Sequence, residues 1–154
     1  METGNLNIDA ETAFARAQRG RHLRQATGWL LRRSRSSSRL LCLEQALRAP
    51  APASRRGIGR REIPVASIVG TAEQAKARAF DRSFRPPLTS RRRWEALWIA
   101  GRRAAPLPPI SVYRLDDRYF VSDGHHRVSV ARALGMTAID AEVTELGRLR
   151  CAGR

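Results

Sequence analysis

Apolar residues at helical spacing mark the first predicted element of the chain. The pattern i, i+3, i+4, i+7 is filled by Ala10, Ala13, Phe14 and Ala17. It predicts a helix over residues 8–26, with Asp9 and Glu11 in the first turn, where helices favour acidic side chains. Leucines within 40–47 predict a short second helix, and the wholly polar stretch 32–39 before them is expected to be a basic loop.

The pattern changes after an Ala-Pro stretch at residues 49–53, which is expected to form a stiff extended linker. The elements expected beyond it are a strand over 63–69, helices over 71–80 and 91–100, a hairpin of strands 110–115 and 118–122, a helix over 127–134 and a last strand over 137–144. Ser90 and Gly101 are expected to cap and end the second of these helices. Trp94 and Trp98 share one face of it, so both are expected in the core.

This order of elements predicts an α+β fold, a short mixed sheet with packed helices, preceded by a basic helical arm. We place the arm and its linker at residues 1–60, the folded domain at 61–146 and a tail at 147–154. The formal net charge of +15 is uneven: residues 1–62 carry +8, residues 63–105 carry +6 and residues 106–154 carry only +1. Every basic residue except Lys76 is an arginine, whose planar guanidinium can grip a phosphate with two hydrogen bonds.

Composition and length exclude several classes of protein. With 154 residues, 42% of them hydrophobic, the chain can build one modest core, so a fully disordered chain is not expected. No apolar run approaches the roughly 18–20 residues of a membrane span, and the acidic N-terminal segment does not resemble a signal peptide. The two cysteines, Cys42 and Cys151, make no disulfide framework, so a cytoplasmic location is expected.

The segment Asp123-Gly124-His125-His126-Arg127 carries the candidate chemistry. It joins a predicted strand to a predicted helix N-terminus, whose first N–H groups lack partners within the helix and attract anions. Gly124 has no Cβ to block the close approach of a ligand, and the two imidazoles and the guanidinium supply further donors. We therefore expect Gly124, His125, His126 and Arg127 to hold phosphate groups.

Two other interpretations of these residues stay open. Asp123 could be only a helix cap, with both histidines at the surface and Arg127 paired with a nearby acid. Asp123, His125 and His126 are also possible metal ligands. Adjacent histidines on a helix point about 100° apart, however, so both seldom bind one ion. We therefore expect no protein metal site.

These residues resemble the ParB/sulfiredoxin-like superfamily. The matching pieces are the Asp123–Arg127 segment, the strand that begins Ile63-Pro64-Val65, and Leu107-Pro108-Pro109-Ile110 ahead of the hairpin. The likeness covers roughly residues 62–144. It implies a ParB-like domain that binds a nucleotide di- or triphosphate, alone or with Mg²⁺, through a Gly-x-x-Arg box at a helix start.

Departures from the superfamily's patterns narrow the implied activity. Sulfiredoxins need a cysteine where this chain has His125, so reductase chemistry is not expected. Partition proteins carry Glu-Arg-Arg where this chain has His125-His126-Arg127, so that only Arg127 matches their motif. The resemblance therefore implies CTP hydrolysis and a role in chromosome partitioning through Arg127 alone. The Asp-Gly-His-x-Arg form is more similar to a kinase branch. It makes Asp123 and His125 candidate catalytic residues and leaves open whether phosphate is hydrolysed, transferred or only bound.

Arginine clusters support an alternative hypothesis, a basic accessory protein that binds nucleic acid without catalysis. The candidate DNA contacts are Arg32, Arg33, Arg35, Arg55, Arg56, Arg91, Arg92 and Arg93. Arginines in such numbers neutralise phosphates along a nucleic-acid backbone. No helix-turn-helix or aromatic stacking platform is evident, so contacts to phosphates rather than bases are expected.

Overall fold

The computed structural model describes residues 4–30, 39–47 and 54–147. Its helices are α1 (Leu6–Leu30), α2 (Leu43–Leu47), α3 (Gln74–Ala79), α4 (Arg91–Arg102) and α5 (His125–Ala133). Its strands are β1 (Leu41–Cys42), β2 (Ser54–Pro64), β3 (Ile68–Thr71), β4 (Ile110–Leu115), β5 (Arg118–Asp123) and β6 (Ala138–Gly147). Two short 3₁₀ turns, η2 (Val65–Ser67) and η3 (Leu88–Ser90), precede β3 and α4.

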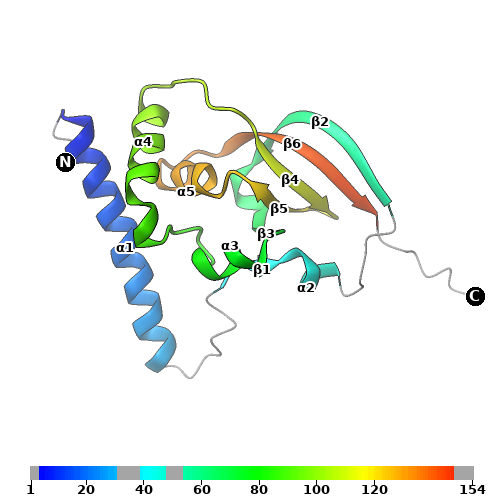
Figure 1. The fold of residues 1–154 in the computed structure, drawn as a ribbon, viewed down its shortest axis with the longest axis horizontal. Helices are drawn as coiled ribbons and strands as arrows, with labels where there is room; N and C mark the ends of the chain where they lie inside the picture. Colours follow the sequence, from blue (N-terminus) through cyan, green and yellow to red (C-terminus); the bar gives the residue numbers. More distant parts are fainter. Residues whose placement is uncertain (1–3, 31–38, 48–53, 148–154) are drawn as a thin grey trace, which may run out of the picture.

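The strands form one mixed sheet in the order β1-β3-β5-β4-β6-β2, which confirms the predicted α+β class. The pairs β1–β3, β3–β5 and β4–β6 are parallel, whereas β4–β5 and β2–β6 are antiparallel. Helices α1, α4 and α5 gather at one end of the molecule, and β2 with β6 forms the opposite end (Figure 1). The end of β5 therefore leads directly into the helical end through α5.

Apolar side chains form a core on each face of the sheet and a third cluster between helices. One sheet face packs Ile110, Val112 and Val143 with Val128 of α5, and the other packs Leu115, Phe120 and Leu146 with Leu43 of α2. The third cluster joins Ala10 and Phe14 of α1 to Trp94 and Trp98 of α4 and Val130 of α5. Trp94 is fully buried and Trp98 is 7% exposed, so the predicted core position of both tryptophans is confirmed.

The Ala-Pro linker predicted at 49–53 lies outside the described residues, but residues 54–60, which we also placed ahead of the folded domain, are described. They form the first part of β2, which pairs with β6 from Ser54 opposite Gly147 to Pro64 opposite Ala138. Most side chains of β2 are exposed, and its four arginines interrupt any alternation of apolar and polar residues. The strand is formed by backbone pairing with a segment far away in the sequence, which leaves no local pattern to predict it.

Three further predicted elements differ from the structure. The expected single strand over 63–69 is broken by η2, so that Pro64 ends β2 and a separate strand, β3, begins at Ile68. The leucine-rich segment that we expected to be helical begins as strand β1 and becomes helix only at Leu43. Ser90 does not cap α4 with its side chain, because its hydroxyl donates to the Pro87 carbonyl, 2.9 Å away.

The predicted arm is joined to the rest of the fold through α1. Besides the apolar cluster with α4, the Gln18 side chain donates to the Pro86 carbonyl at 2.7 Å, and Arg21 donates to the Ala79 carbonyl at 2.8 Å. In return, Arg85 donates to the Gly20 carbonyl at 2.6 Å. Helix α1 also runs to Leu30, beyond the predicted end near Gly28. The division of the chain into an arm and a domain with separate roles stays a prediction.

Candidate functional site

The predicted phosphate-binding segment lies where β5 meets α5, as expected, with Gly124 at the N-cap position of the helix. Gly124 has a φ of +100°, a conformation that residues with a Cβ rarely adopt. A Cβ here would also lie 2.5 Å from Cγ2 of Ile110 and 3.1 Å from the Arg127 guanidinium. The glycine is therefore required by the turn and by packing against β4, independently of any ligand.

His125 is buried rather than open to a ligand. Its side chain is 3% exposed, its Nε2 lies 2.7 Å from Oγ1 of Thr71, and its ring lies against the rings of Phe80 and Phe84. Burial, with a smaller contribution from the nearby Lys76 ammonium, lowers the pKa of His125 to about 4. The imidazole is therefore neutral at pH 7, and its contacts position the start of α5.

His126 is also neutral, but one of its ring nitrogens has no partner. Its Nε2 is buried and forms no hydrogen bond with the described residues, while its ring meets Phe80 edge to face at 5.1 Å. Burial, with smaller contributions from the positive charges of Arg93 and Lys76, lowers the pKa of His126 to about 4. Side chains from α3 and α4 thus bring positive charge to the first turn of α5.

The Arg127 guanidinium is already engaged within the protein. It donates to Oδ2 of Asp123 at 2.6 Å, to the Pro109 carbonyl at 2.7 Å and to the Pro108 carbonyl. These bonds tie the start of α5 to the segment that leads into β4. Arg127 is thus paired with a nearby acid, Asp123, which was one of the interpretations that the sequence left open. The Asp123 side chain is nevertheless 70% exposed.

The side chains of this segment leave little free positive charge for an anion, because both imidazoles are neutral and the Arg127 guanidinium is paired with Asp123. What remains for an anion is the helix N-terminus itself, where the first helical bond runs from Val128 N–H to the Gly124 carbonyl and no side chain caps the preceding N–H groups. Lys76 and Arg93 add positive charge beside it. Sequence reasoning missed Lys76, whose only signal was that it is the sole lysine in the chain. Catalytic roles for Asp123 and His125 stay predictions.

The predicted nucleic-acid arginines fall into three different settings. Arg32, Arg33 and Arg35 lie outside the described residues. Arg55 and Arg56 are exposed on β2, where Arg55 lies over the Tyr113 ring at 5.7 Å. Arg91, Arg92 and Arg93 are exposed in the first turn of α4, and Arg91 pairs with Glu95 at 2.7 Å and Glu11 at 3.4 Å.

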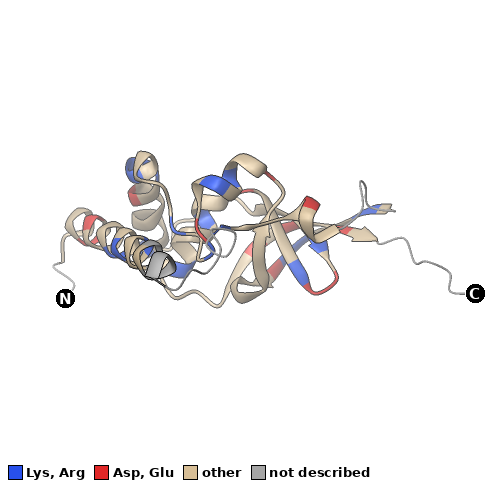
Figure 2. Cartoon of the chain, turned by 90° about the horizontal axis from the view of Figure 1, so that it is seen from below, with Lys and Arg blue, Asp and Glu red and all other residues tan. Residues whose placement is uncertain are grey.

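Acidic residues of β6 compensate the arginines of β2. Arg60 and Asp140 form an ion pair at 2.5 Å, and Arg56 lies directly across from Glu145 in the strand pairing. The four arginines and one glutamate of β2 carry a net positive charge equal in size to the negative charge of the three acids of β6. The formal charges of the two strands therefore cancel. In Figure 2 red and blue side by side mark these strands, away from the helical end.

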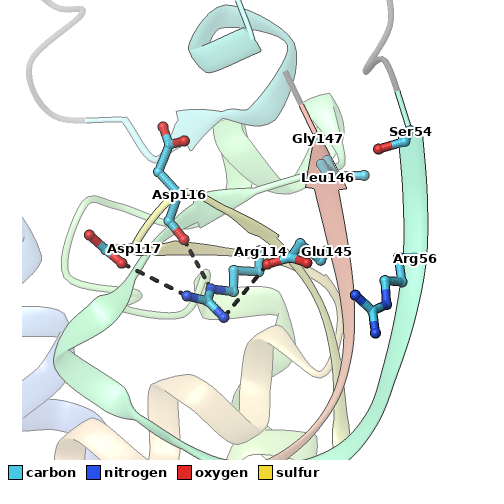
Figure 3. Close-up of a pocket in the computed structure, with 8 residues that line it drawn as sticks. All are labelled: Ser54, Arg56, Arg114, Asp116, Asp117, Glu145, Leu146 and Gly147. Atoms are coloured by element: carbon cyan, nitrogen blue, oxygen red, sulfur yellow. Dashed lines mark hydrogen bonds and ion pairs between the residues drawn. The ribbon is translucent and has the colours of Figure 1, made fainter. Parts of the chain in front are cut away.

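A shallow pocket of about 580 Å³ lies at the opposite end of the sheet from α5, around the turn between β4 and β5. Arg114 occupies its centre and is held by the Asp116 carbonyl, Asp117 and Glu145 (Figure 3). Arg56 lines the same pocket from β2. Because its charges are mixed and its arginine is engaged, this pocket offers no set of groups that converge on one ligand.

Comparisons with known proteins give a likeness to a solved structure. No family model matches the chain, and no curated protein matches it significantly. Among solved structures, the chain is similar to the crystal structure of sulfiredoxin from Arabidopsis thaliana, with 21% identity and a TM-score of 0.39 over 55% of this chain and 82% of that one. This likeness concerns the fold alone.

The described residues hold neither a group of side chains suited to a metal ion nor a membrane-spanning helix. No three or more His, Cys, Asp or Glu side chains cluster there in a way that could hold a metal ion. None of the helices in residues 4–30, 39–47 and 54–147 is long and apolar enough to cross a membrane.

Proposed function

We propose that the chain binds the phosphate groups of a nucleotide at the N-terminus of α5. The observation that carries this proposal is a helix N-terminus that no side chain caps, with Lys76 and Arg93 near enough to lower the pKa of His126 in its first turn. Both cations lower the pKa of His126, so both act on that turn electrostatically. Free N–H groups at a helix N-terminus favour anions, and a nearby ammonium or guanidinium strengthens the attraction.

Within this site the residues divide into three roles. The backbone N–H groups of residues 125–127, with Lys76, supply the phosphate contacts. His125 and Arg127 are positioning residues, because their own side chains hydrogen-bond to Thr71 and to the Pro109 carbonyl. Asp123 is the candidate contact for a nucleotide-bound Mg²⁺, since its carboxylate is largely exposed.

Replacement of Lys76 by alanine tests the proposal. The nucleotide would lose one charge-assisted contact, worth about 1.5–3 kcal/mol, so affinity should fall by roughly ten- to a hundredfold. Thermal shift of the full chain with ATP, ADP, CTP, GTP and inorganic pyrophosphate, each with and without Mg²⁺, measures this, because a ligand that binds only the folded state raises its stability.

Arg78→Ala is the matched control, since Arg78 is exposed on the same short helix and forms no ion pair with the described residues. It should leave the nucleotide-induced shift unchanged. An absence of any shift in the wild-type protein, or an equal loss in the Lys76 and Arg78 variants, would contradict a phosphate site at α5.

A further inference from the structure

Strand β2 forms one edge of the sheet. It pairs with β6 along one side, and none of the other described strands pairs with its second side. It is the outermost strand at the end of the molecule opposite the helices (Figure 1). Every second residue of an antiparallel strand turns its N–H and C=O groups away from its partner. The 11 residues of β2 therefore offer a row of backbone donors and acceptors along the open side.

The register of β2 against β6 places two of its arginines on one face of the sheet. Arg56 lies opposite Glu145 and Arg61 opposite Ala141, which are four residues apart on β6 and therefore share a face. The odd spacing of the two arginines along β2 is absorbed by the bulge in that strand. Both arginines are exposed, and neither forms an ion pair with a described residue, since Glu145 is engaged by Arg114 at 3.7 Å. We call these two residues the edge arginine pair.

The arginines on the opposite face of β2 are already used. Arg60 forms an ion pair with Asp140 at 2.5 Å, and Arg55 lies over the Tyr113 ring at 5.7 Å. Glu62, the acidic residue of β2, is on this second face as well, because it lies two residues from Arg60. The face with the edge arginine pair is thus the one where β2 has positive charge without an acid of its own.

We propose that β2 binds an extended acidic segment of another protein, which joins the sheet as an additional strand with its carboxylates at the edge arginine pair. In such strand addition the backbone hydrogen bonds supply affinity, and the side chains of the added strand supply selectivity. Opposite charges across neighbouring strands attract, and β6, the partner of β2 on its inner side, is itself a strand with three acids. The surface lies at the other end of the molecule from α5, so this inference goes beyond the nucleotide site.

Other occupants fit this edge less well. The phosphate backbone of a nucleic acid offers acceptors only, whereas the edge presents both N–H and C=O groups and needs a partner with donors as well. A second copy of the chain would bring the arginines of its own β2 to the edge, where like charges repel. Charged side chains keep most strands away from an edge, but arginines admit a strand that carries acids.

Labelled peptides of about ten residues, a usual strand length, test the proposal on the full chain by fluorescence anisotropy. An alternating Glu-Thr peptide has an acid at every second position and β-branched residues between. An alternating Lys-Thr peptide reverses the charge, and an alternating Glu-Pro peptide keeps the charge but lacks half of the backbone N–H groups. The Glu-Thr peptide should bind, and the two others should bind at least about tenfold more weakly.

Hydrogen exchange followed by mass spectrometry locates the bound peptide. Exchange in residues 54–64 should slow when the Glu-Thr peptide binds, because outward amides of β2 then gain partners. A peptide held by charge alone would leave this exchange unchanged.

Two double variants with equal changes in net charge test the role of the arginines. Arg56→Gln/Arg61→Gln should weaken binding of the Glu-Thr peptide by about three- to thirtyfold, the range for two charge pairs across strands. Arg16→Gln/Arg19→Gln, at exposed positions of α1, should leave it unchanged, because distant exposed charges are screened. All four are surface substitutions, so both variants should melt like the wild type.

Several results would overturn the proposal. They are equal losses in both variants, binding without slower exchange in residues 54–64, and no binding of the Glu-Thr peptide at up to about 1 mM. Displacement of the peptide by duplex DNA would assign the edge to nucleic acid instead. Exchange in residues 54–64 that slows with rising protein concentration, without peptide, would assign it to a second copy. None of these measurements involves a nucleotide, so failure here is distinguishable from failure of the site at α5.

Discussion

At the scale of single residues, the Asp123–Arg127 segment is shaped by contacts within the protein. Gly124 is required by a positive φ and by Ile110, and Arg127 holds the two carbonyls ahead of β4. The sequence correctly placed this segment at a helix N-terminus, because a strand, a glycine and a helical pattern follow one another there. It could not show which side chains would be used internally, since Thr71 and the Pro108-Pro109 carbonyls come from distant parts of the chain.

His125 should make the stability of the protein depend on pH. Its pKa is about 4 in the folded protein and near 6.5 when unfolded, so protonation favours the unfolded state. The stabilisation is complete above pH 6.5 and is lost as pH falls from 6.5 toward 4, by on the order of 3 kcal/mol over the whole window. The thermal midpoint of the wild type should therefore fall between pH 7 and pH 5.

His125→Gln removes this titrating group while keeping a polar atom near Thr71, so its midpoint should fall less over the same interval. His22→Gln, at an exposed position of α1, is the control and should fall as much as the wild type. A His125→Gln protein whose midpoint follows the wild-type pH dependence would show that His125 does not carry the effect.

At the scale of elements, local patterns predicted those that bury one regular face. The hairpin β4–β5 and helices α4 and α5 were predicted close to their observed positions, because apolar residues recur there at the period of the element. Strands β1 and β2 were missed for the opposite reason. β1 has two residues, and β2 is mostly exposed, so both depend on pairing with β3 and β6 rather than on their own sequence.

Trp94 is the side chain that joins three helices, and its loss should be costly. It is fully buried, contacts Phe14 of α1, and donates from Nε1 to Oγ of Ser129 of α5 at 2.9 Å. Trp94→Ala should lower the free energy of unfolding by about 3–5 kcal/mol, measured by urea denaturation. Leu88→Ala, at a side chain 64% exposed, should change it by less than about 0.5 kcal/mol. Similar small effects in both variants would contradict the core assignment.

At the scale of the whole molecule, α1 packs against elements that follow it in the chain. It covers Trp94 and Trp98 and exchanges hydrogen bonds with the segment around Arg85. A chain that begins after residue 30 should therefore expose an aromatic cluster, bind a hydrophobic dye such as ANS and unfold at lower temperature than the full chain.

Phe14→Ala tests the same contact without truncation. Because Phe14 is 3% exposed, its replacement should lower the free energy of unfolding by about 3–5 kcal/mol. A truncated chain that melts like the full one, together with a neutral Phe14→Ala substitution, would instead support a separable arm.

Strand β2 is translated well before β6, its antiparallel partner in the sheet. Ser54 lies opposite Gly147, so the whole of β2 leaves the ribosome long before the strand that will pair with it has been translated. During that interval the backbone N–H and C=O groups of β2 have no partner strand. Unpaired strands of this kind can pair with another copy of the chain. Two such strands placed antiparallel about Ile58 would bring Arg55 opposite Arg61 and Arg56 opposite Arg60. Like charges that face each other across strands repel, so the arginines of β2 disfavour this pairing between two nascent copies.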